Sequence, residues 1–352
     1  MLKLLTVSIA AYNVEKTIEK CLDSFLPCKH LNELEILVIN DGSKDHTAEI
    51  VSGYEKRYPG IIYLINKENG GHGSTINKSL SIAKGKFFKV IDGDDWVNAE
   101  ELDKLVECLT DTTAELVIND YMEVYPDNTY RISLRDGYQI KKVYEFDDLL
   151  TDIKHLHNIF AMHSCTILTR RLHDVHMHIV EHCFYADTEY IYFVELAAKT
   201  ILFDDSCAYQ YRLGQAGQSV SAEGTYRHAE DLAKIELDLM RMYMKNRNFL
   251  SSEVKKKYLF SIVETRYNML LGWFINIIRK SDKDHYLIDF LIETHRKYPE
   301  IERAIYVEPE YRLVVKLPKV MLPLFRNILP KIKRTPMNSF LKRIKYFIFY
   351  NN

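Results

Sequence analysis

A short, almost uninterrupted apolar run that leads directly into three carboxylates is the feature that most constrains this chain. Residues 87–91 read Phe-Phe-Lys-Val-Ile, which is the pattern of a strand buried in a parallel sheet. Residues 92–95 (Asp-Gly-Asp-Asp) follow, and Asn98 then opens a helix with Glu101 three positions later, which is a capping-box pattern. The acids are therefore predicted to lie at the carboxyl end of a strand, where open α/β sheets bind ligands.

Three carboxylates on one short loop predict a metal site. Acids packed this closely repel one another, and removing them from water is costly. A divalent cation removes both penalties, and an Asp-x-Asp loop suits Mg²⁺ or Mn²⁺ shared with substrate phosphates. We therefore predict a metal site formed by Asp94, Asp92 and Asp95. The alternative is an acidic turn that only caps the next helix.

The chain before this loop alternates between strands and helices. Apolar runs at residues 4–10, 34–40 and 61–65 predict three strands, and each is followed by a helical pattern. With residues 87–91 as a fourth strand, this order predicts a mostly parallel α/β sheet flanked by helices, a Rossmann-like nucleotide-binding half. A nucleotide should then lie across the strand ends.

Four motifs in this order resemble family 2 glycosyltransferases over roughly the first 110 residues. They are Val-Ser-Ile-Ala-Ala-Tyr-Asn (7–13), Val-Ile-Asn-Asp-Gly-Ser (38–43), Asn-Gly-Gly (69–71) with Asn77, and Ile-Asp-Gly-Asp-Asp (91–95). The resemblance implies a GT-A fold, a nucleotide-sugar donor, a divalent metal and inversion at the anomeric carbon. It departs from the family where a proline is replaced by Ala10-Ala11 and an arginine by Thr75, which affects donor contacts but not the class.

The resemblance also implies the residues that contact the donor. Tyr12 is expected to stack on the base, and Asp41 to accept its imide N–H, which favours uracil. The strand and glycine-bearing loop at residues 208–221 suit a mobile lid over the diphosphate, with Arg212 supplying a bidentate contact. The expected nucleotide-sugar-binding residues are Ala10, Tyr12, Asp41, Asn69, Gly71, Asp92, Gly93, Arg212, Gln218 and Ser219.

Asp187 is the expected catalytic base. In the family that the chain resembles, an acid pair that ends in Asp opens a helix after the donor domain. Here the first acid of that pair is Ala186, so only Asp187 carries over. An ordinary helix N-cap is the alternative interpretation of Asp187, and Glu189 is the competing base.

Seven of the thirteen histidines fall between residues 155 and 182. His155 and His157, like His176 and His178, are spaced by two, and we favour polar lining of the acceptor side over a metal cluster. His163 precedes an apolar strand at residues 165–168 and is positioned to face the ligand site.

The expected domain organisation has three parts. Residues 1–224 form the GT-A-like catalytic domain, with nucleotide-sugar binding in 1–110 and the acceptor side and lid in 111–224. Residues 225–310 are an α-helical region, and residues 311–352 are a basic amphipathic tail with ten Lys or Arg and no acid. This leaves 37 basic and 49 acidic side chains in the body, which argues against nucleic-acid binding. The tail suits an anionic membrane surface, and a dimer-forming helix (a homo-oligomer) or a flap on the catalytic domain are the alternatives.

Cysteine usage and hydropathy predict the compartment. The six cysteines are scattered without a Cys-x-x-Cys pair, which is typical of a reducing compartment. The N-terminus runs directly into a strand pattern, so no secretory signal is expected, and no uncharged apolar run reaches the length of a membrane span. We expect a cytoplasmic protein, peripheral on the inner face of the cell membrane.

The acidic loop and the resemblance together imply an inverting glycosyltransferase that moves a sugar from a UDP-sugar to a hydroxyl acceptor, and the resemblance implies a role in surface polysaccharide or glycolipid synthesis. A sugar-1-phosphate nucleotidyltransferase would need a glycine-rich basic loop after the first strand, where this chain has residues 10–13 (Ala-Ala-Tyr-Asn). A catalytically inactive nucleotide-sugar-binding protein is the non-enzymatic alternative, and the intact acids argue against it.

Overall fold

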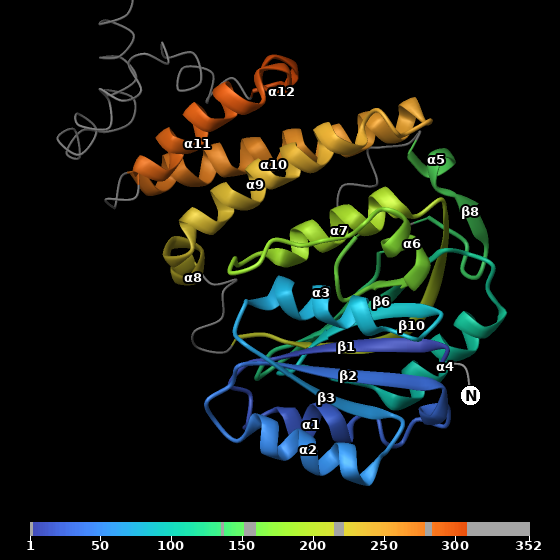
Figure 1. The fold of residues 1–352 in the computed structure, drawn as a ribbon. Helices are drawn as coiled ribbons and strands as arrows, with labels where there is room; N and C mark the ends of the chain where they lie inside the picture. The colour runs from blue at the N-terminus through green and yellow to red at the C-terminus, as the bar shows by residue number, and fades with distance from the viewer. Residues whose placement is uncertain (1–2, 135–136, 151–159, 215–221, 279–283, 308–352) are drawn as a thin grey trace, which may run out of the picture. The chain divides into compact units, whose positions relative to one another are not determined.

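The computed structural model describes residues 3–134, 137–150, 160–214, 222–278 and 284–307 (Figure 1). The chain divides into two compact units. Residues 1–218 with 252–258 form the first, and residues 219–251 with 259–352 form the second.

The first half of the sheet is parallel. The strands β1 (Leu5–Ala11), β2 (Leu34–Asp41), β3 (Ile62–Lys67) and β4 (Phe87–Asp92) are arranged in the order β3-β2-β1-β4. They alternate with α1 (Ile18–Asp23), α2 (Thr47–Arg57) and α3 (His72–Ile82), and a 3₁₀ turn at Leu31–Glu33 precedes β2. The strand–helix alternation predicted from the apolar runs is therefore confirmed.

The second half of the sheet is mixed. Strand β9 (Cys165–Leu168) lies antiparallel between β4 and β6 (Leu116–Val124), and β6 is parallel to β10 (Thr200–Arg212). Three short strands, all antiparallel to their partners, add to β6 and β10: β5 (Trp96–Val97), β7 (Thr129–Ile132) and β8 (Val143–Glu145). The predicted α/β architecture holds, with antiparallel pairs concentrated beyond β4.

Helices cover both faces of this sheet. Helices α1 and α2 lie on one face and α3 on the other (Figure 1). Helix α4 (Ala99–Asp111) shares the core of α1 and α2, and the Asn98 side chain caps it by accepting the Glu101 N–H at 3.1 Å. Helices α5 (Phe146–Leu149), α6 (Thr169–Asp174) and α7 (Ala186–Ala197) complete the unit. Because helices cover both faces of the sheet, its faces are buried, and the ends of its strands are where polar side chains can meet a ligand.

The second unit is helical, as predicted. It contains α8 (Ala222–Arg227), α9 (Ala229–Asn246), most of α10 (Glu253–Ile278), α11 (Asp284–Lys297) and α12 (Pro299–Ala304). Its core is made of apolar side chains that include Ile235, Leu239, Leu271 and Leu287. Within the described ranges, no helix combines the length and the apolar character needed to cross a membrane. The predicted basic tail, residues 311–352, lies outside the described residues.

Candidate functional site

The acidic loop lies at the carboxyl end of β4, as the sequence predicts. Ala10 and Asp92 are paired in the parallel ladder between β1 and β4, and the Gly93 N–H donates to the Ala10 carbonyl oxygen at 2.9 Å. A Cβ atom at Gly93 would lie 2.7 Å from that oxygen. Glycine is therefore required here, because it lets the loop turn close against β1.

Two acids of the loop face protein cations. Asp92 Oδ1 lies 2.8 Å from Nε2 of His72 in the first turn of α3, and Asp94 Oδ2 lies 3.2 Å from Nη2 of Arg212 at the end of β10. Although burial alone would raise it, His72 holds the pKa of Asp92 below its usual range. Burial, followed by the charge of Asp92, raises the pKa of Asp94. The negative charge of Asp94 is thus less well balanced by neighbouring cations than that of Asp92.

Among the three acids of the loop, Asp95 is the one whose negative charge is least balanced by its surroundings. Its side chain is buried, its Oδ2 accepts the Tyr209 hydroxyl proton at 2.7 Å, and its Oδ1 accepts the backbone N–H of Arg212 at 2.7 Å. Burial, followed by the charges of Asp92 and Asp94, raises the pKa of Asp95 to about 8. At neutral pH this carboxyl group therefore retains a proton unless a cation takes its place.

His163 reaches the same loop from the segment before β9. The centroid of its ring lies 4.1 Å from that of Tyr211, 4.7 Å from that of Tyr209 and 5.1 Å from that of Tyr121. Burial lowers the pKa of His163 to about 4, so the imidazole is neutral at pH 7. The structure therefore places His163 beside the acids, as the sequence indicated.

One group of side chains at this edge has the chemistry of a metal site. The potential ligand atoms of Asp92, Asp95 and His163 all lie within 4.8 Å of one another. Asp94, the third predicted ligand, is not in that group and pairs with Arg212 instead. We give the name acidic edge to six residues: His72, Asp92, Asp94, Asp95, His163 and Arg212. Metal coordination by Asp92, Asp94 and Asp95 stays a prediction.

Asp41 organises the glycine loop. Its carboxylate accepts the backbone N–H groups of Gly70 and Gly71 at 2.9 and 2.8 Å and the Lys67 ammonium at 2.7 Å. The Asn69 side chain donates to the Asp41 carbonyl oxygen at 2.9 Å. Asp41, Asn69 and Gly71 thus form one hydrogen-bonded corner beside α3, and their contacts with a nucleotide stay predictions.

Tyr12 lies at the end of β1 with half of its surface exposed. Its exposed fraction is 50%. The next residue, Asn13, has a positive φ of 53° and accepts the Lys44 N–H at 2.8 Å, which fixes the turn. An exposed aromatic ring on a fixed turn is suited to stacking on a base, the role predicted for it.

Asp187 is exposed in the first turn of α7. The N-cap of this helix, Tyr185, has a left-handed backbone with φ of 64°. Helix α7 begins beside the first turn of α3, which carries His72, because a Cβ atom at Gly73 would lie 3.4 Å from Cβ of Ala186. By contrast, Glu189 is fully buried and accepts the Val180 N–H at 2.7 Å. Burial thus favours Asp187 over Glu189 as the residue that can meet an acceptor.

The predicted lid is described only in part. Arg212 ends β10 next to Asp94 and Asp95. Gln218 and Ser219, the other predicted lid contacts, lie outside the described residues.

Three residues of this region were not expected from the sequence. His72 lies in the predicted glycine loop, but nothing in its spacing pointed to Asp92. Tyr209 comes from a strand far along the chain. Lys89 interrupts the apolar run of β4, and its ammonium donates to the His163 carbonyl oxygen at 2.7 Å while fully buried. That interruption was a visible signal, because a lysine inside a buried strand needs partners.

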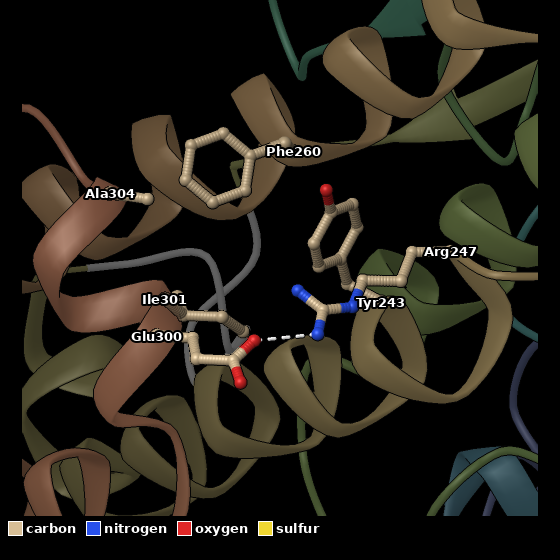
Figure 2. A pocket seen from close by; sticks show the side chains of 6 residues that line it. All are labelled: Tyr243, Arg247, Phe260, Glu300, Ile301 and Ala304. Carbon is tan, nitrogen blue, oxygen red and sulfur yellow. Dashed lines mark hydrogen bonds and ion pairs between the residues drawn. The ribbon is translucent and has the colours of Figure 1, made fainter.

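The helical unit contains a separate pocket of about 140 Å³. Figure 2 shows the guanidinium of Arg247 turned toward the Glu300 carboxylate, with an Nη2–Oε2 distance of 2.6 Å. The rings of Tyr243 and Phe260 lie 5.4 Å apart between centroids. We call it the helical pocket, and its lining residues are Tyr243, Arg247, Phe260, Glu300, Ile301 and Ala304.

Sequence comparison matches the region that contains the acidic edge. Residues 6–176 match the model of Glycosyl transferase family 2. The chain is 30% identical to the uncharacterized glycosyltransferase EpsJ of Bacillus subtilis over 157 residues, 45% of this chain and 44% of EpsJ. It is 33% identical to the chondroitin synthase of Pasteurella multocida over 127 residues, 36% of this chain and 13% of that enzyme. The chain thus spans less than half of the length of either relative.

Structural comparison extends beyond the matched domain. The structure of S. aureus TarS residues 1–349 in complex with UDP-GlcNAc is similar with a TM-score of 0.66 and 16% identity, covering 93% of this chain and 89% of that one. At this identity the likeness shows the fold, here the GT-A fold with a helical C-terminal region. The four motifs, the family match and the fold agree, so residues 6–176 form a glycosyl transferase family 2 domain.

Proposed function

We propose that this chain is an inverting glycosyltransferase that moves a sugar from a UDP-sugar to a hydroxyl group of a carbohydrate or lipid-linked acceptor. The observation that carries the proposal is that three acids and Arg212 meet at one edge of a family 2 domain, with Asp187 in the first turn of the helix that begins beside α3. Surface polysaccharide or glycolipid synthesis at the inner face of the membrane is the setting that we propose for it.

The donor would lie across the strand ends. The exposed ring of Tyr12 stacks on the base, and the corner made by Asp41, Asn69 and Gly71 lies where the base and ribose need polar contacts. Asp41 already accepts three N–H donors, so a fourth from uracil would use the remaining lone pair of Oδ2. Arg212 is placed to bind the diphosphate once it leaves Asp94.

The residues of the acidic edge fit a divalent cation, Mg²⁺ or Mn²⁺. Asp95 would lose its raised pKa beside a cation, and Nδ1 of His163 is buried with no hydrogen-bond partner in the described part of the chain. Asp92, Asp94 and Asp95 are the residues that would hold it. When bound, such an ion neutralises the charge that develops on the departing nucleoside diphosphate.

The transfer step is a single displacement. Asp187 takes the proton from the acceptor hydroxyl as that oxygen forms a bond to the anomeric carbon. The bond between this carbon and the diphosphate oxygen breaks on the opposite face, so an α-linked donor gives a β-glycoside. Asp187 lies exposed in the first turn of α7, where the partial positive charge of a helix N-terminus favours an acidic side chain.

A panel of UDP-sugars with Mn²⁺, scored by UDP release, tests this proposal without knowledge of the acceptor. We expect release with at least one sugar, and its loss in EDTA and in Asp94→Ala with an unchanged melting temperature. The matched control is Asp174→Ala, which removes an exposed acid of α6 whose partner is Arg171. Full release in EDTA would overturn the metal, and no release with any nucleotide-sugar would favour an inactive binding protein.

A further inference from the structure

The backbone at His163 is held in place by the buried ammonium group of Lys89. The Lys89 ammonium donates to the His163 carbonyl oxygen at 2.7 Å and lies 3.4 Å from the Cys165 carbonyl oxygen and from Oδ1 of Asn119. Because Lys89 is fully buried in β4, its position is fixed relative to the acids that end the same strand. The His163 backbone is therefore held at a set distance from Asp92.

The imidazole of His163 is held as firmly as its backbone. Its ring stacks on Tyr211 with an interplanar angle of 27° and meets Tyr209 edge-on at 79°. Nδ1 is buried, and among the described residues nothing hydrogen-bonds to it. A fixed, buried ring nitrogen without a partner carries a desolvation penalty, and a ligand that binds the nitrogen would remove it.

The distances at this point suit one ion. The ligand atoms of Asp92, Asp95 and His163 lie within 4.8 Å of one another. With metal–ligand bonds of about 2.0–2.2 Å, ligand atoms of a single ion lie about 3–4.4 Å apart, so a contraction of a few tenths of an ångström closes the site.

Both carboxylates also have the outer hydrogen bonds typical of metal ligands. His72 binds Asp92 Oδ1, while Tyr209 and the Arg212 N–H bind the two oxygens of Asp95. Such outer partners orient the ligands of a metal site. The remaining lone pairs of the two acids can then be directed at one point beside His163.

We propose that His163 is a further protein ligand of the cation, beside Asp92 and Asp95 and in addition to Asp94, which joins them once Arg212 leaves it. This deepens the proposed function and rests on it for the role of the ion, but the ligand set can be tested without a sugar donor. A neutral imidazole favours transition metals such as Mn²⁺, whereas Mg²⁺ prefers oxygen ligands. The site should therefore prefer Mn²⁺ to Mg²⁺, and His163 should be the cause.

The direct test is pulsed electron paramagnetic resonance of the full chain loaded with Mn²⁺, with and without UDP. We expect a ¹⁴N coupling from a directly bound imidazole in the wild type. This nitrogen coupling should be lost in His163→Gln. It should be kept in His72→Gln, because in the wild type the His72 imidazole binds Asp92 and not the metal. A wild-type spectrum without nitrogen coupling, or coupling lost only in His72→Gln, would overturn the proposal. The wild-type spectrum decides even where a variant fails to fold.

Calorimetric titration with Mn²⁺ and Mg²⁺ adds the selectivity. His163→Gln should weaken Mn²⁺ binding about tenfold or more and change Mg²⁺ binding by less than about twofold. His46→Gln, which alters a largely exposed histidine of the same unit, is the matched control and should change neither. Equal losses for both ions would overturn the selectivity. Nitrogen-coupled Mn²⁺ without any UDP release would instead overturn the proposed function and leave this ligand set standing.

Discussion

The acidic edge of the sheet and the helical pocket both contain ionised side chains, but their charges are balanced differently. In the helical pocket one guanidinium, Arg247, meets one carboxylate, Glu300. At the acidic edge three carboxylates share Arg212 and an imidazole, and the pKa of Asp95 rises to about 8. A balanced pair is satisfied within the protein, whereas the surplus of acids requires protons or an external cation. This difference favours the acidic edge as the candidate reactive site.

The largest effect is expected from removing the proposed base, Asp187. Asp187→Asn is nearly isosteric and exposed, so the free energy of unfolding should change little. Without a carboxylate to take the acceptor proton, the transfer rate should fall by about 10²–10⁴. UDP-sugar and Mn²⁺ affinities, measured by calorimetry, should remain near those of the wild type.

The competing residue supplies the control for this experiment. Glu189 is buried and binds the Val180 N–H, so Glu189→Gln should affect folding more than transfer. If Asp187→Asn kept its activity while Glu189→Gln folded normally and lost it, the base would be Glu189.

A smaller effect is expected from Lys89, the buried cation beneath the acidic edge. Burial lowers its pKa to about 8, from a usual value near 10.5. Below pH 8 both the folded and the unfolded chain hold the proton, so the penalty for burying the charge is constant. Between about pH 8 and 10.5 the unfolded chain binds more protons, so the stability of the wild type rises with pH. Lys89→Met lacks this gain, which should be about 2 kcal/mol between pH 7 and pH 9.5 in urea unfolding.

A second buried lysine, Lys255, is the control that distinguishes the effect of Lys89 on stability from an effect on metal binding. Lys255 in α10 is buried, donates to the Ala198 carbonyl oxygen, and has a pKa that burial lowers to about 8. Lys255→Met should lose a similar pH slope but keep Mn²⁺ affinity. Lys89→Met should weaken Mn²⁺ binding as well, because it releases the His163 backbone. Equal Mn²⁺ affinity in both variants would show that Lys89 only stabilises the fold.

The parts of the fold that the sequence could predict are those with local signals. The strands β1 to β4 appear as apolar runs in the sequence. The start of α4 is marked by the capping-box pattern of Asn98 and Glu101. The insertion of β9 between β4 and β6 has no such signal, because a strand's neighbours are decided by packing over long sequence separations. A reading of successive strand–helix units gives no reason to place residues 165–168 next to β4.

The same limit applies to the site. The acids at 92–95 could be found because they follow the end of an apolar strand, and the base candidate Asp187 because the resemblance to a known family pointed to it. The partners His72, Tyr209 and Arg212 belong to α3 and β10, and only the folded chain brings them to the acids. Motif reading therefore found Arg212 and the residues expected to carry the chemistry, but it missed His72 and Tyr209, and it did not pair Arg212 with Asp94.

The smallest effect is expected in the helical pocket. Arg247 and Glu300 keep 30% and 54% of their side-chain surface exposed, so their ion pair should contribute less than about 1 kcal/mol. Nε of Arg247 is also buried without a hydrogen-bond partner in the described residues, so Arg247→Met removes a penalty along with the pair. A double-mutant cycle with Glu300→Gln, measured by urea unfolding at low and high salt, should give a small coupling that salt reduces. The pair Lys234–Glu230 on α9, at 2.8 Å, is the matched exposed control. A coupling well above that of the control, or a loss of transfer in Arg247→Met, would mean that the helical pocket is more than a balanced pair and would remove the contrast with the acidic edge.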